Sequence, residues 1–434
     1  MYKETFTLEY LQKVQKVLDF AVNNDYSGFY RSKYKEHGFE LQAIRSYEDF
    51  QKIPLLSRSE ILATPLKDRI FVPRKDVVHY AFSAGTTDQN KPLIMPHHAF
   101  TYKTAKTPLR MFSPERIAKL GVDIIMVLRH PLSSPFIKQL TVPKKGILSV
   151  PGDIRNLPLS AKLAKELGIN CISTTPTVLT FFLQELEKVG FDFNLIKFVY
   201  MTGELCSSQR LALIKSKMPK AYIDINYTVS ELSIVGYRCS HLADEPPNLF
   251  HVHTAAFLEI LSESEEANQP GNIVVTDTET PRAFPFIRYR LGDIGLIERQ
   301  KCACGEEIML KLGGRSRYDF LRFHGVVLHT QAIENSLDAV RNFLEPGFQM
   351  HVYEELINEK LTPRLVFKVV AKEAASPFLL NLLKENVSQN LFLTADKTLD
   401  YFVENKIFAP LEVELIDAWP DGKAKAKNII SHLT

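Results

Sequence analysis

The sequence of 434 residues is short of cysteine, of net charge and of long apolar runs. Its five cysteines, an odd number spread widely through a large chain, argue against a disulfide framework and leave metal binding or buried thiols. A formal charge of +3, from 53 basic and 50 acidic residues, gives no general electrostatic attraction for nucleic acid or an anionic membrane. Partners must therefore be inferred from local sites.

Targeting signals are also missing. The first 20 residues place charges among apolar residues at helical spacing, and they lack the apolar run and small-residue cleavage site of a signal peptide. No stretch approaches the ~18 consecutive apolar residues that a membrane-spanning helix needs. We therefore expect a cytoplasmic protein with no membrane partner. No internal repeat or low-complexity tract interrupts the chain.

Length and periodicity predict more than one domain, because single cores usually stop growing near ~250 to 300 residues. Residues 8–22 carry apolar side chains every three or four positions and are expected to form a packing helix. Further on, short apolar runs alternate with helical periodicity, which indicates an α/β domain. The expected strands are 122–128, 147–150, 171–173, 198–201 and 223–225, and the expected helices are 159–167 and 176–189.

After about Asn248 the pattern changes to strand-rich segments, HVHTAAFLEIL and GNIVVTDT, which predict a β subdomain at about 240–318 closing a domain of residues 1–318. Residues 319–434 predict a small α+β unit. Its expected strands are FLRFHGVVL, HVYEEL, RLVFKVVA and LEVELID, and its expected helices are 330–340 and 377–391.

Three loops carry residue types suited to a nucleotide. AFSAGTTDQNKP (81–92) is rich in hydroxyls, with a glycine and a lysine that can surround phosphate oxygens, although the Walker A spacing is absent. YTVSE (227–231) places Glu231 just past an apolar run, where a carboxylate can bind magnesium. RYRLGD (288–293) places Asp293 in a turn, where it can accept hydrogen bonds from ribose hydroxyls. Taken singly, each segment is more often an ordinary surface loop.

The order of these and other segments resembles the adenylate-forming superfamily, specifically its phenylacetate-CoA ligase-like branch, which includes coenzyme F390 synthetase relatives. The resemblance covers nearly the whole chain. Each motif is weak alone, but eight in the same order over about 400 residues are specific. These eight segments are SAGTT at Ser83, STTPT at Ser173, GE at Gly203, YTVSE, RYRLGD, GRSRYD, GVVLHTQAIE and GKAKAK. The N-terminal segments FYRSKY and IPLLSRSEI also resemble segments of the family.

The resemblance implies the roles of individual residues. It assigns Glu231 to magnesium, Asp293 to ribose and Lys423 to the adenylation transition state. It also implies that 319–434 is a mobile lid that turns about a hinge near Asp319. The remaining nucleotide residues are Ser83, Gly85, Thr86, Thr87 and Lys91 for phosphates, with Thr86 also catalytic; Tyr227 and Thr228 near adenine; Gly203 and Glu204 lining the pocket; and Arg315 near the hinge.

Cysteine and histidine form a group that is independent of the nucleotide motifs. CACG (302–305) offers two thiolates, and the segment 239–253 offers a third together with His241, His251 and His253. Such ligands suit tetrahedral zinc, and the residues alone leave the histidine open. The resemblance points to a structural zinc at Cys239, His251, Cys302 and Cys304.

Some positions depart from the family pattern. The phosphate loop lacks the family glycine after Thr87, and residues 88–90 lengthen the approach to Lys91. No counterpart of the family's glycine-rich aryl-pocket stretch is present; MVLRHPLSSPF (126–136) stands in its region, which argues against phenylacetate as the substrate. Candidate acyl-pocket residues by position are Met201, 130–136 and Val229.

The resemblance implies an enzyme that uses ATP and magnesium to turn a small carboxylic acid into an acyl-adenylate. It then passes the acyl group to a thiol, either coenzyme A or the phosphopantetheine of an acyl carrier protein. The alternative is a degenerate relative that binds nucleotide or a protein partner without catalysis. The altered phosphate loop supports that alternative, whereas Glu231, Asp293 and Lys423 oppose it.

Overall fold

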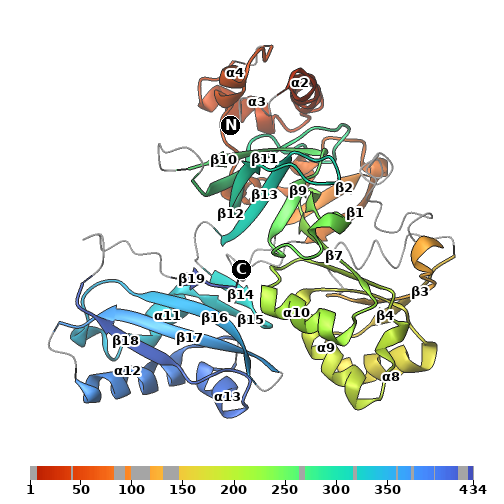
Figure 1. The fold of residues 1–434 in the computed structure, drawn as a ribbon. Helices are drawn as coiled ribbons and strands as arrows, with labels where there is room; N and C mark the ends of the chain where they lie inside the picture. Colours follow the sequence, from red (N-terminus) through yellow and green to blue (C-terminus); the bar gives the residue numbers. More distant parts are fainter. Residues whose placement is uncertain are drawn as a thin grey trace.

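The computed structural model describes residues 7–40, 43–82, 93–98, 118–130, 146–262, 269–315, 320–357, 360–372, 376–394, 396–418 and 429–433. Its fold is mixed α/β (Figure 1). Among these residues, none of the helices has both the length and the apolar character that crossing a membrane requires.

Five parallel strands form one half of the largest sheet, in the order β4-β3-β5-β6-β7. Strands β5 and β6 are buried at every position, as parallel strands covered on both faces should be. The strands and helices expected here are confirmed with small shifts of their ends. They are β3 (Ile124–Leu128), β4 (Leu148–Gly152), α8 (Leu157–Leu167), β5 (Cys171–Thr174), α9 (Pro176–Lys188), β6 (Phe198–Thr202) and β7 (Tyr222–Val229). Helix α10 (Ser208–Lys217), between β6 and β7, was not expected.

Strand β7 joins this parallel half to an antiparallel half, because it pairs with β6 on one side and with β8 on the other. The strands expected as a β subdomain thus continue the same sheet of 11 strands. The segment HVHTAAFLEIL is two strands separated by a turn. The antiparallel strands are β8 (Ser233–Tyr237), β9 (Leu249–Val252), β10 (Ala256–Leu261), β11 (Gly271–Asp277), β12 (Tyr289–Arg299) and β13 (Ile308–Arg315).

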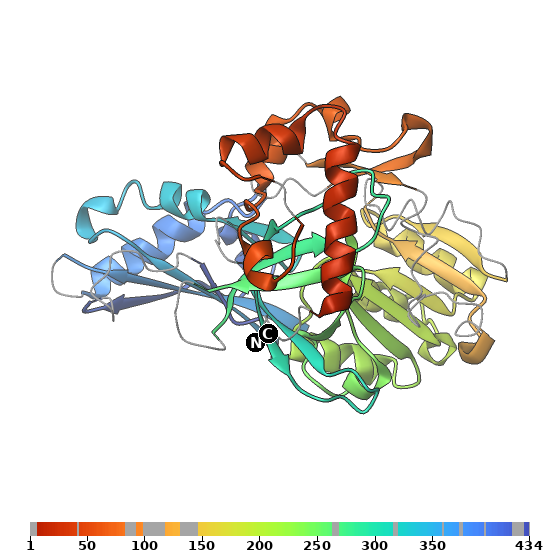
Figure 2. The same cartoon turned by 90° about the horizontal axis from the view of Figure 1, so that it is seen from above.

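The N-terminal helices pack on the antiparallel half. Helix α2 (Leu8–Asn23) begins at Thr7, whose side chain accepts a hydrogen bond from the Tyr10 backbone, and it buries one apolar stripe against the sheet, in contact with β11 (Figure 2). The expected helix 8–22 is confirmed. It is followed by α3 (Phe29–Glu36), α4 (Tyr47–Gln51), α5 (Arg58–Ala63) and the hairpin of β1 (Val77–Phe82) and β2 (Ile94–His98). Short 3-10 turns lie at Leu66–Arg69, Arg74–Asp76, Phe193–Leu195, Ser240–Leu242 and Arg341–Phe343.

A second core lies entirely in residues beyond 320. A four-stranded sheet, in the order β18-β17-β16-β19, packs against α12 with its apolar face. The elements are β14 (Phe320–Phe323), β15 (Val326–His329), α11 (Thr330–Ser336), β16 (Gln349–Ile357), β17 (Lys360–Val370), α12 (Pro377–Asn390), α13 (Leu399–Glu404), β18 (Glu412–Ile416) and β19 (Ile429–Ser431). We call 320–433 the C-terminal unit. The expected hinge at Asp319 lies outside the described residues.

Two details of the C-terminal unit differ from the expectation. FLRFHGVVL is a hairpin rather than one strand, because His324 and Gly325 turn the chain with φ of 47° and 80°. Such left-handed angles are typical of a glycine turn, so Gly325 was the available signal. The helix expected at 330–340 ends at Ser336.

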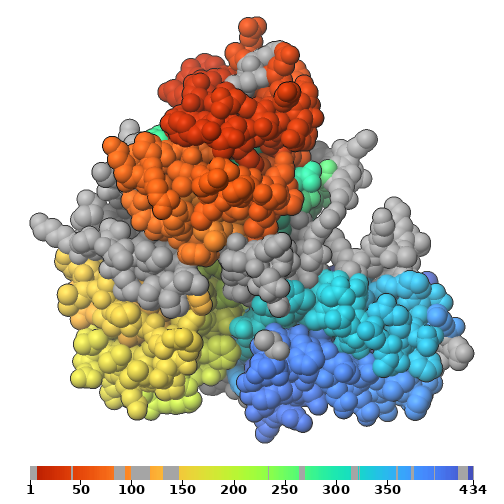
Figure 3. Space-filling model, turned by 180° about the vertical axis from the view of Figure 1, so that it is seen from behind, coloured from red at the N-terminus to blue at the C-terminus, as the bar shows by residue number. Residues whose placement is uncertain are grey.

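The C-terminal unit lies beside the parallel half in the space-filling view (Figure 3). Glu354 of β16 forms a buried ion pair with Arg210 of α10 and accepts a hydrogen bond of 2.8 Å from Ser207. His324, at the β14–β15 turn, lies 3.5 Å from Glu354 and against the ring of Phe181 on α9. A small polar cluster therefore joins the two parts of the chain.

Candidate functional site

The two strands that flank the expected phosphate loop are tied to the YTVSE turn. Strands β1 and β2 pair antiparallel up to Phe82 and Ile94. The Ser230 hydroxyl donates to the Phe82 carbonyl (3.3 Å), and the His97 ring contacts the Ser230 carbonyl (2.9 Å). The loop between the strands, with Ser83, Gly85, Thr86, Thr87 and Lys91, lies outside the described residues. Its two ends are nevertheless fixed beside Glu231.

Glu231 follows the end of β7 and lies between a tyrosine and an arginine. The Tyr289 hydroxyl donates to Glu231 Oε1 (3.3 Å), and Arg58 Nη1 is 3.9 Å from the same oxygen. Burial and the charge of Glu231 raise the pKa of Tyr289 well above its usual value, so its hydroxyl keeps its proton. The Glu231 side chain is 10% exposed. Carboxylate oxygens of this kind suit magnesium.

Tyr227 and Asp293 are brought together from two motifs. The Tyr227 hydroxyl donates to Asp293 Oδ2 at 2.6 Å, which fixes the carboxylate of a β12 residue against the end of β7. The Thr228 hydroxyl contacts that of Thr202 at the end of β6. The pairing of β12 with β13 places Arg315 opposite Asp293 in register. Residues of three expected motifs therefore meet at one edge of the sheet.

Gly203 and Glu204 follow the end of the neighbouring strand β6. Gly203 has a φ of 100°, which a residue with a side chain rarely adopts. Glu204 accepts a hydrogen bond of 2.6 Å from the Thr177 backbone N–H, near the start of α9. The carboxylate thus satisfies an N–H group in the first turn of that helix. This edge, where parallel strands end, is the place where ligands bind in open α/β sheets.

Arg129, at the end of β3, is a residue that the sequence interpretation did not select. Its guanidinium donates to the Ser173 hydroxyl (3.2 Å) and to the carbonyls of Thr174 (2.6 Å) and Thr202 (3.1 Å). Burial lowers its pKa to about 10, so it stays charged at neutral pH. It ties together the ends of β3, β5 and β6. An arginine directly after the apolar run IIMVL was the signal in the sequence.

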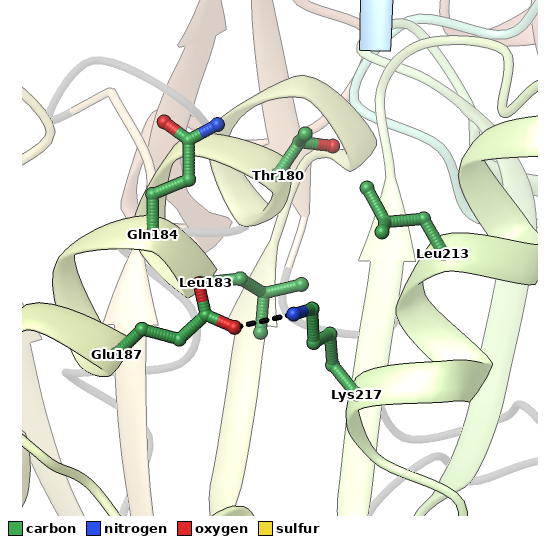
Figure 4. Close-up of a pocket in the computed structure, with 6 residues that line it drawn as sticks. All are labelled: Thr180, Leu183, Gln184, Glu187, Leu213 and Lys217. Carbon is green, nitrogen blue, oxygen red and sulfur yellow. Dashed lines mark ion pairs between the residues drawn. The ribbon is translucent and has the colours of Figure 1, made fainter. Parts of the chain in front are cut away.

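The candidate acyl-pocket residues are only partly described. Met201 is fully buried in the core, His130 is exposed, and Val229 ends β7. Residues 131–136 lie outside the described part of the chain, as does Lys423. A pocket of about 170 Å³ between α9 and α10 is a different place, bridged by the 2.6 Å ion pair of Lys217 and Glu187 (Figure 4). None of the residues expected to bind nucleotide lines it.

Three of the five cysteines and one histidine lie close together on the antiparallel half. One ligand atom from each of Cys239, His251, Cys302 and Cys304 lies within 4.8 Å of the others. The His251 Nε2 atom is 3.3 Å from Cys239 Sγ and 3.4 Å from Cys304 Sγ. Of the other two histidines that the residues left open, His253 accepts a hydrogen bond from the Ala255 backbone (3.1 Å), and His241 is exposed.

The chemistry of this cluster fits a metal ion. Burial, together with the neighbouring thiols, raises the pKa of Cys239 to about 12, because a negative charge would be poorly solvated there. Burial lowers the pKa of His251, which favours the neutral imidazole that binds metals. Three sulfurs and one imidazole nitrogen so close together suit tetrahedral coordination.

Known proteins resemble this chain in sequence and in fold. No model of a protein family matches the chain. Phenylacetate-coenzyme A ligase of Thermus thermophilus is 23% identical over 343 residues, which cover 75% of this chain and 74% of the relative. A solved structure of 2-hydroxyisobutyryl-CoA ligase, with 2-HIB-AMP and CoA in the thioesterification state, aligns with a TM-score of 0.62 at 17% identity. That alignment covers 97% of this chain and 88% of the other.

The same ligase in an open conformation aligns with a TM-score of 0.59 at 16% identity, over 97% of this chain and 90% of the other. At such identities the solved structures show a shared fold. The chain therefore resembles a curated phenylacetate-coenzyme A ligase in sequence and shares its fold with a solved coenzyme A ligase.

Proposed function

We propose that this protein uses ATP to convert a carboxylic acid into an acyl-adenylate and then transfers the acyl group to a thiol. One observation carries the proposal. Tyr227, Glu231 and Asp293 come from two distant motifs, yet they meet at the edge where the parallel strands end. That edge also holds both ends of the expected phosphate loop.

In the first half-reaction a carboxylate oxygen bonds to the α-phosphorus of ATP. The bond from that phosphorus to the β-phosphate oxygen breaks, and its electron pair leaves with pyrophosphate. Glu231 would hold magnesium, whose charge stabilises the phosphate oxygens. We assign the phosphates to Ser83, Gly85, Thr86, Thr87 and Lys91, with Thr86 and Lys423 acting in the transition state. Positioning and charge stabilisation are the main work in such transfers.

The nucleoside is assigned to residues around Asp293. Its carboxylate accepts hydrogen bonds from ribose hydroxyls, and the 2.6 Å bond from Tyr227 orients it for that task. Tyr227 and Thr228 adjoin adenine in this proposal. Gly203 and Glu204 line the pocket from β6, while Arg315 contributes from the end of β13.

In the second half-reaction a thiol attacks the acyl carbon and AMP leaves. The C-terminal unit turns about a hinge near Asp319 to admit the thiol. Coenzyme A and the phosphopantetheine of a carrier protein are both suitable acceptors. The relatives named above are coenzyme A ligases, which supports the first.

We also propose that Cys239, His251, Cys302 and Cys304 hold a structural zinc ion. A set of four protein ligands leaves no open coordination position for a substrate. The cluster would therefore stabilise the antiparallel half and take no part in the chemistry.

A pyrophosphate-exchange assay with magnesium and a panel of carboxylates tests the proposed function. Aryl, aliphatic and amino acids are each supplied, and the expected result is carboxylate-dependent incorporation of labelled pyrophosphate into ATP. Exchange with none of these classes would refute the catalytic proposal. ATP binding without exchange would favour the degenerate relative instead. Coenzyme A and a phosphopantetheine-bearing carrier are then compared with the active acid.

A further inference from the structure

The segment IPLLSRSEI matches a family motif, but the proposed function gives it no role. The structure fixes this segment firmly. The Leu56 backbone N–H donates to the Arg288 carbonyl, and the Leu56 carbonyl accepts from the Arg290 N–H, each at 2.9 Å. Leu56 thereby forms a parallel bridge to Tyr289, in the RYRLGD motif. The residues that directly follow Leu56 therefore start from a fixed position beside the RYRLGD motif.

The helix that follows, α5, is equally well fixed. Ser57 and Glu60 form a reciprocal capping box, in which each side chain bonds the other's backbone N–H. Glu60 also pairs with the buried ammonium of Lys33. Arg58 is the first helical residue after the cap, so its backbone position is determined on both sides.

Arg58 extends from this helix to the proposed magnesium ligand. Its Nη1 atom is 3.9 Å from Glu231 Oε1, the same oxygen that the Tyr289 hydroxyl contacts. The Arg58 side chain is 24% exposed. It can therefore meet a ligand that enters from solvent.

These contacts place a permanent positive charge beside the carboxylate expected to hold magnesium. During adenylation negative charge moves onto the departing pyrophosphate. A guanidinium presents several N–H donors in a planar fork that matches phosphate oxygens, and it stays charged at any relevant pH. Arginine beside a metal is a common way of stabilising such transfers.

We propose that Arg58 is a phosphate-binding residue of the adenylation centre, contacting the β- and γ-phosphate oxygens of ATP beside the metal site at Glu231. This inference rests on the proposed function. As the bond to the α-phosphorus breaks, the electron pair stays on the pyrophosphate oxygen, and Arg58 compensates part of its charge. AMP, which lacks these phosphates, does not use Arg58.

Titration calorimetry of the full chain tests the assignment. Wild-type protein, Arg58→Gln and Arg58→Lys are each titrated with magnesium ATP, magnesium pyrophosphate and AMP. Arg74→Gln is the matched control, because Arg74 is an exposed arginine on another turn. Arg58→Gln should weaken the binding of ATP and pyrophosphate roughly tenfold to a hundredfold, as loss of charge-assisted hydrogen bonds does. AMP binding and the control should be unchanged.

Every other outcome overturns either the role of Arg58 or the proposed function. Equal pyrophosphate affinity in wild type and Arg58→Gln overturns the role of Arg58 and leaves the proposed function intact. A defect that disappears at saturating magnesium also overturns it, because Arg58 would then only position Glu231. If Arg58→Gln does not fold, Arg58→Lys must bind pyrophosphate more weakly than wild type, and equal binding overturns the assignment. Wild-type protein that binds neither ATP nor pyrophosphate refutes the proposed function itself.

Discussion

Two glutamate–arginine pairs in this molecule use the same residue types in different ways. Arg288 contacts both carboxylate oxygens of Glu259 at 3.0 Å, and the two side chains are 6% and 1% exposed. Arg58 approaches Glu231 at 3.9 Å through one atom, with exposures of 24% and 10%. The first pair lies deep between α4 and the antiparallel strands. The second pair lies near the ends of β1 and β2, which contact Ser230 beside Glu231.

The difference separates a contact that serves the fold from a proposed binding site. Arg288 also donates to the Ile53 carbonyl (2.7 Å), so its donors are used within the fold. A buried, bidentate pair of this kind fixes one arrangement, and removing one partner leaves a charge in a dry interior. Glu231 and Arg58 keep contact with solvent, where a magnesium ion and phosphate oxygens can reach them. Substitutions in the two classes of contact should therefore differ in what they change.

The Cys–His cluster is expected to be the strongest structural contact of all. Protein purified without added metal should contain close to one zinc per chain. Cys302→Ser should lose the metal and several kcal/mol of stability, since structural zinc contributes ~10–16 kcal/mol in zinc-finger peptides. Metal analysis and denaturant unfolding measure this, with the buried cysteine Cys171→Ser as control. A stable, metal-free wild type would reject the site.

The buried pair should come next. Glu259→Gln should lower the free energy of unfolding by about 3–5 kcal/mol, because Arg288 keeps its charge without a compensating carboxylate. Glu412→Gln is the matched control, since its ion pair with Arg364 is half exposed and should contribute under about 1 kcal/mol. Exchange activity per folded molecule should survive in both variants. Equal stability of the two variants would remove the contrast between buried and open pairs.

Substitution of Lys423 tests the proposed adenylation chemistry rather than the stability of the fold. Lys423→Ala should lower the turnover of adenylation by about 10²–10³, the usual loss when one transition-state donor is removed, with little change in nucleotide binding. The second half-reaction, started from presynthesised acyl-adenylate and thiol, should proceed at near wild-type rate. Lys425→Ala serves as the control in the same tail. Equal losses in both half-reactions would mean that the tail acts in folding or docking.

Glu231 belongs to the more exposed of the two glutamate–arginine pairs, whereas Glu259 belongs to the buried one. Glu231→Ala should reduce exchange at limiting magnesium roughly tenfold to a hundredfold, because a metal-binding oxygen is lost. Its thermal midpoint should stay close to that of wild type, in contrast with Glu259→Gln. Exchange rates across a magnesium series provide the measurement. Wild-type activity at limiting magnesium would rule out Glu231 as the metal ligand.

Glu354 and Arg210 form a third pair, between the two parts of the chain, and it should respond to acid. Burial lowers the pKa of His324. Burial raises that of Glu354, but hydrogen bonds from His324 and Ser207 and the charge of Arg210 outweigh it and lower the pKa. Arg210 and Lys360 also oppose a charge on His324.

Because both pKa values are lowered in the folded protein, both groups make its stability increase with pH. The contact contributes fully above about pH 6.5, the unfolded histidine value, and loses stability as pH falls, because the unfolded imidazole takes up a proton first. A further loss follows below about pH 4.3, where the unfolded carboxyl is protonated while Glu354 resists. Thermal midpoints from pH 8 to 4 measure this. Asparagine tolerates the left-handed backbone at position 324. The variant His324→Asn should therefore remove only the loss of stability that begins near pH 6.5. An unchanged profile would contradict the assignment.

Apolar periodicity predicted most of the elements, because burial on one or both faces is written directly into the residue order. The run CIS at 171–173 and the stripe of α2 are examples. Periodicity does not say which strands pair, so the continuation of one sheet through β7 was not predicted. Motif order singled out Tyr227, Glu231 and Asp293, and the roles given to them stay predictions. It did not single out Arg129 and Arg58, because each lies at a place set by backbone pairing between distant segments.

The way residues 8–63 pack has a consequence for synthesis on the ribosome. Their helices bury apolar faces against strands from the antiparallel half, and Arg288 bonds to Ile53 across a separation of 235 residues. Because translation proceeds at ~5–20 residues per second, that surface emerges roughly ten to fifty seconds after the N-terminal helices are synthesised. During this interval the stripe of Val14, Val17 and Leu18 has no native partner. The N-terminal part of the core should therefore be completed only after β12 has left the exit tunnel.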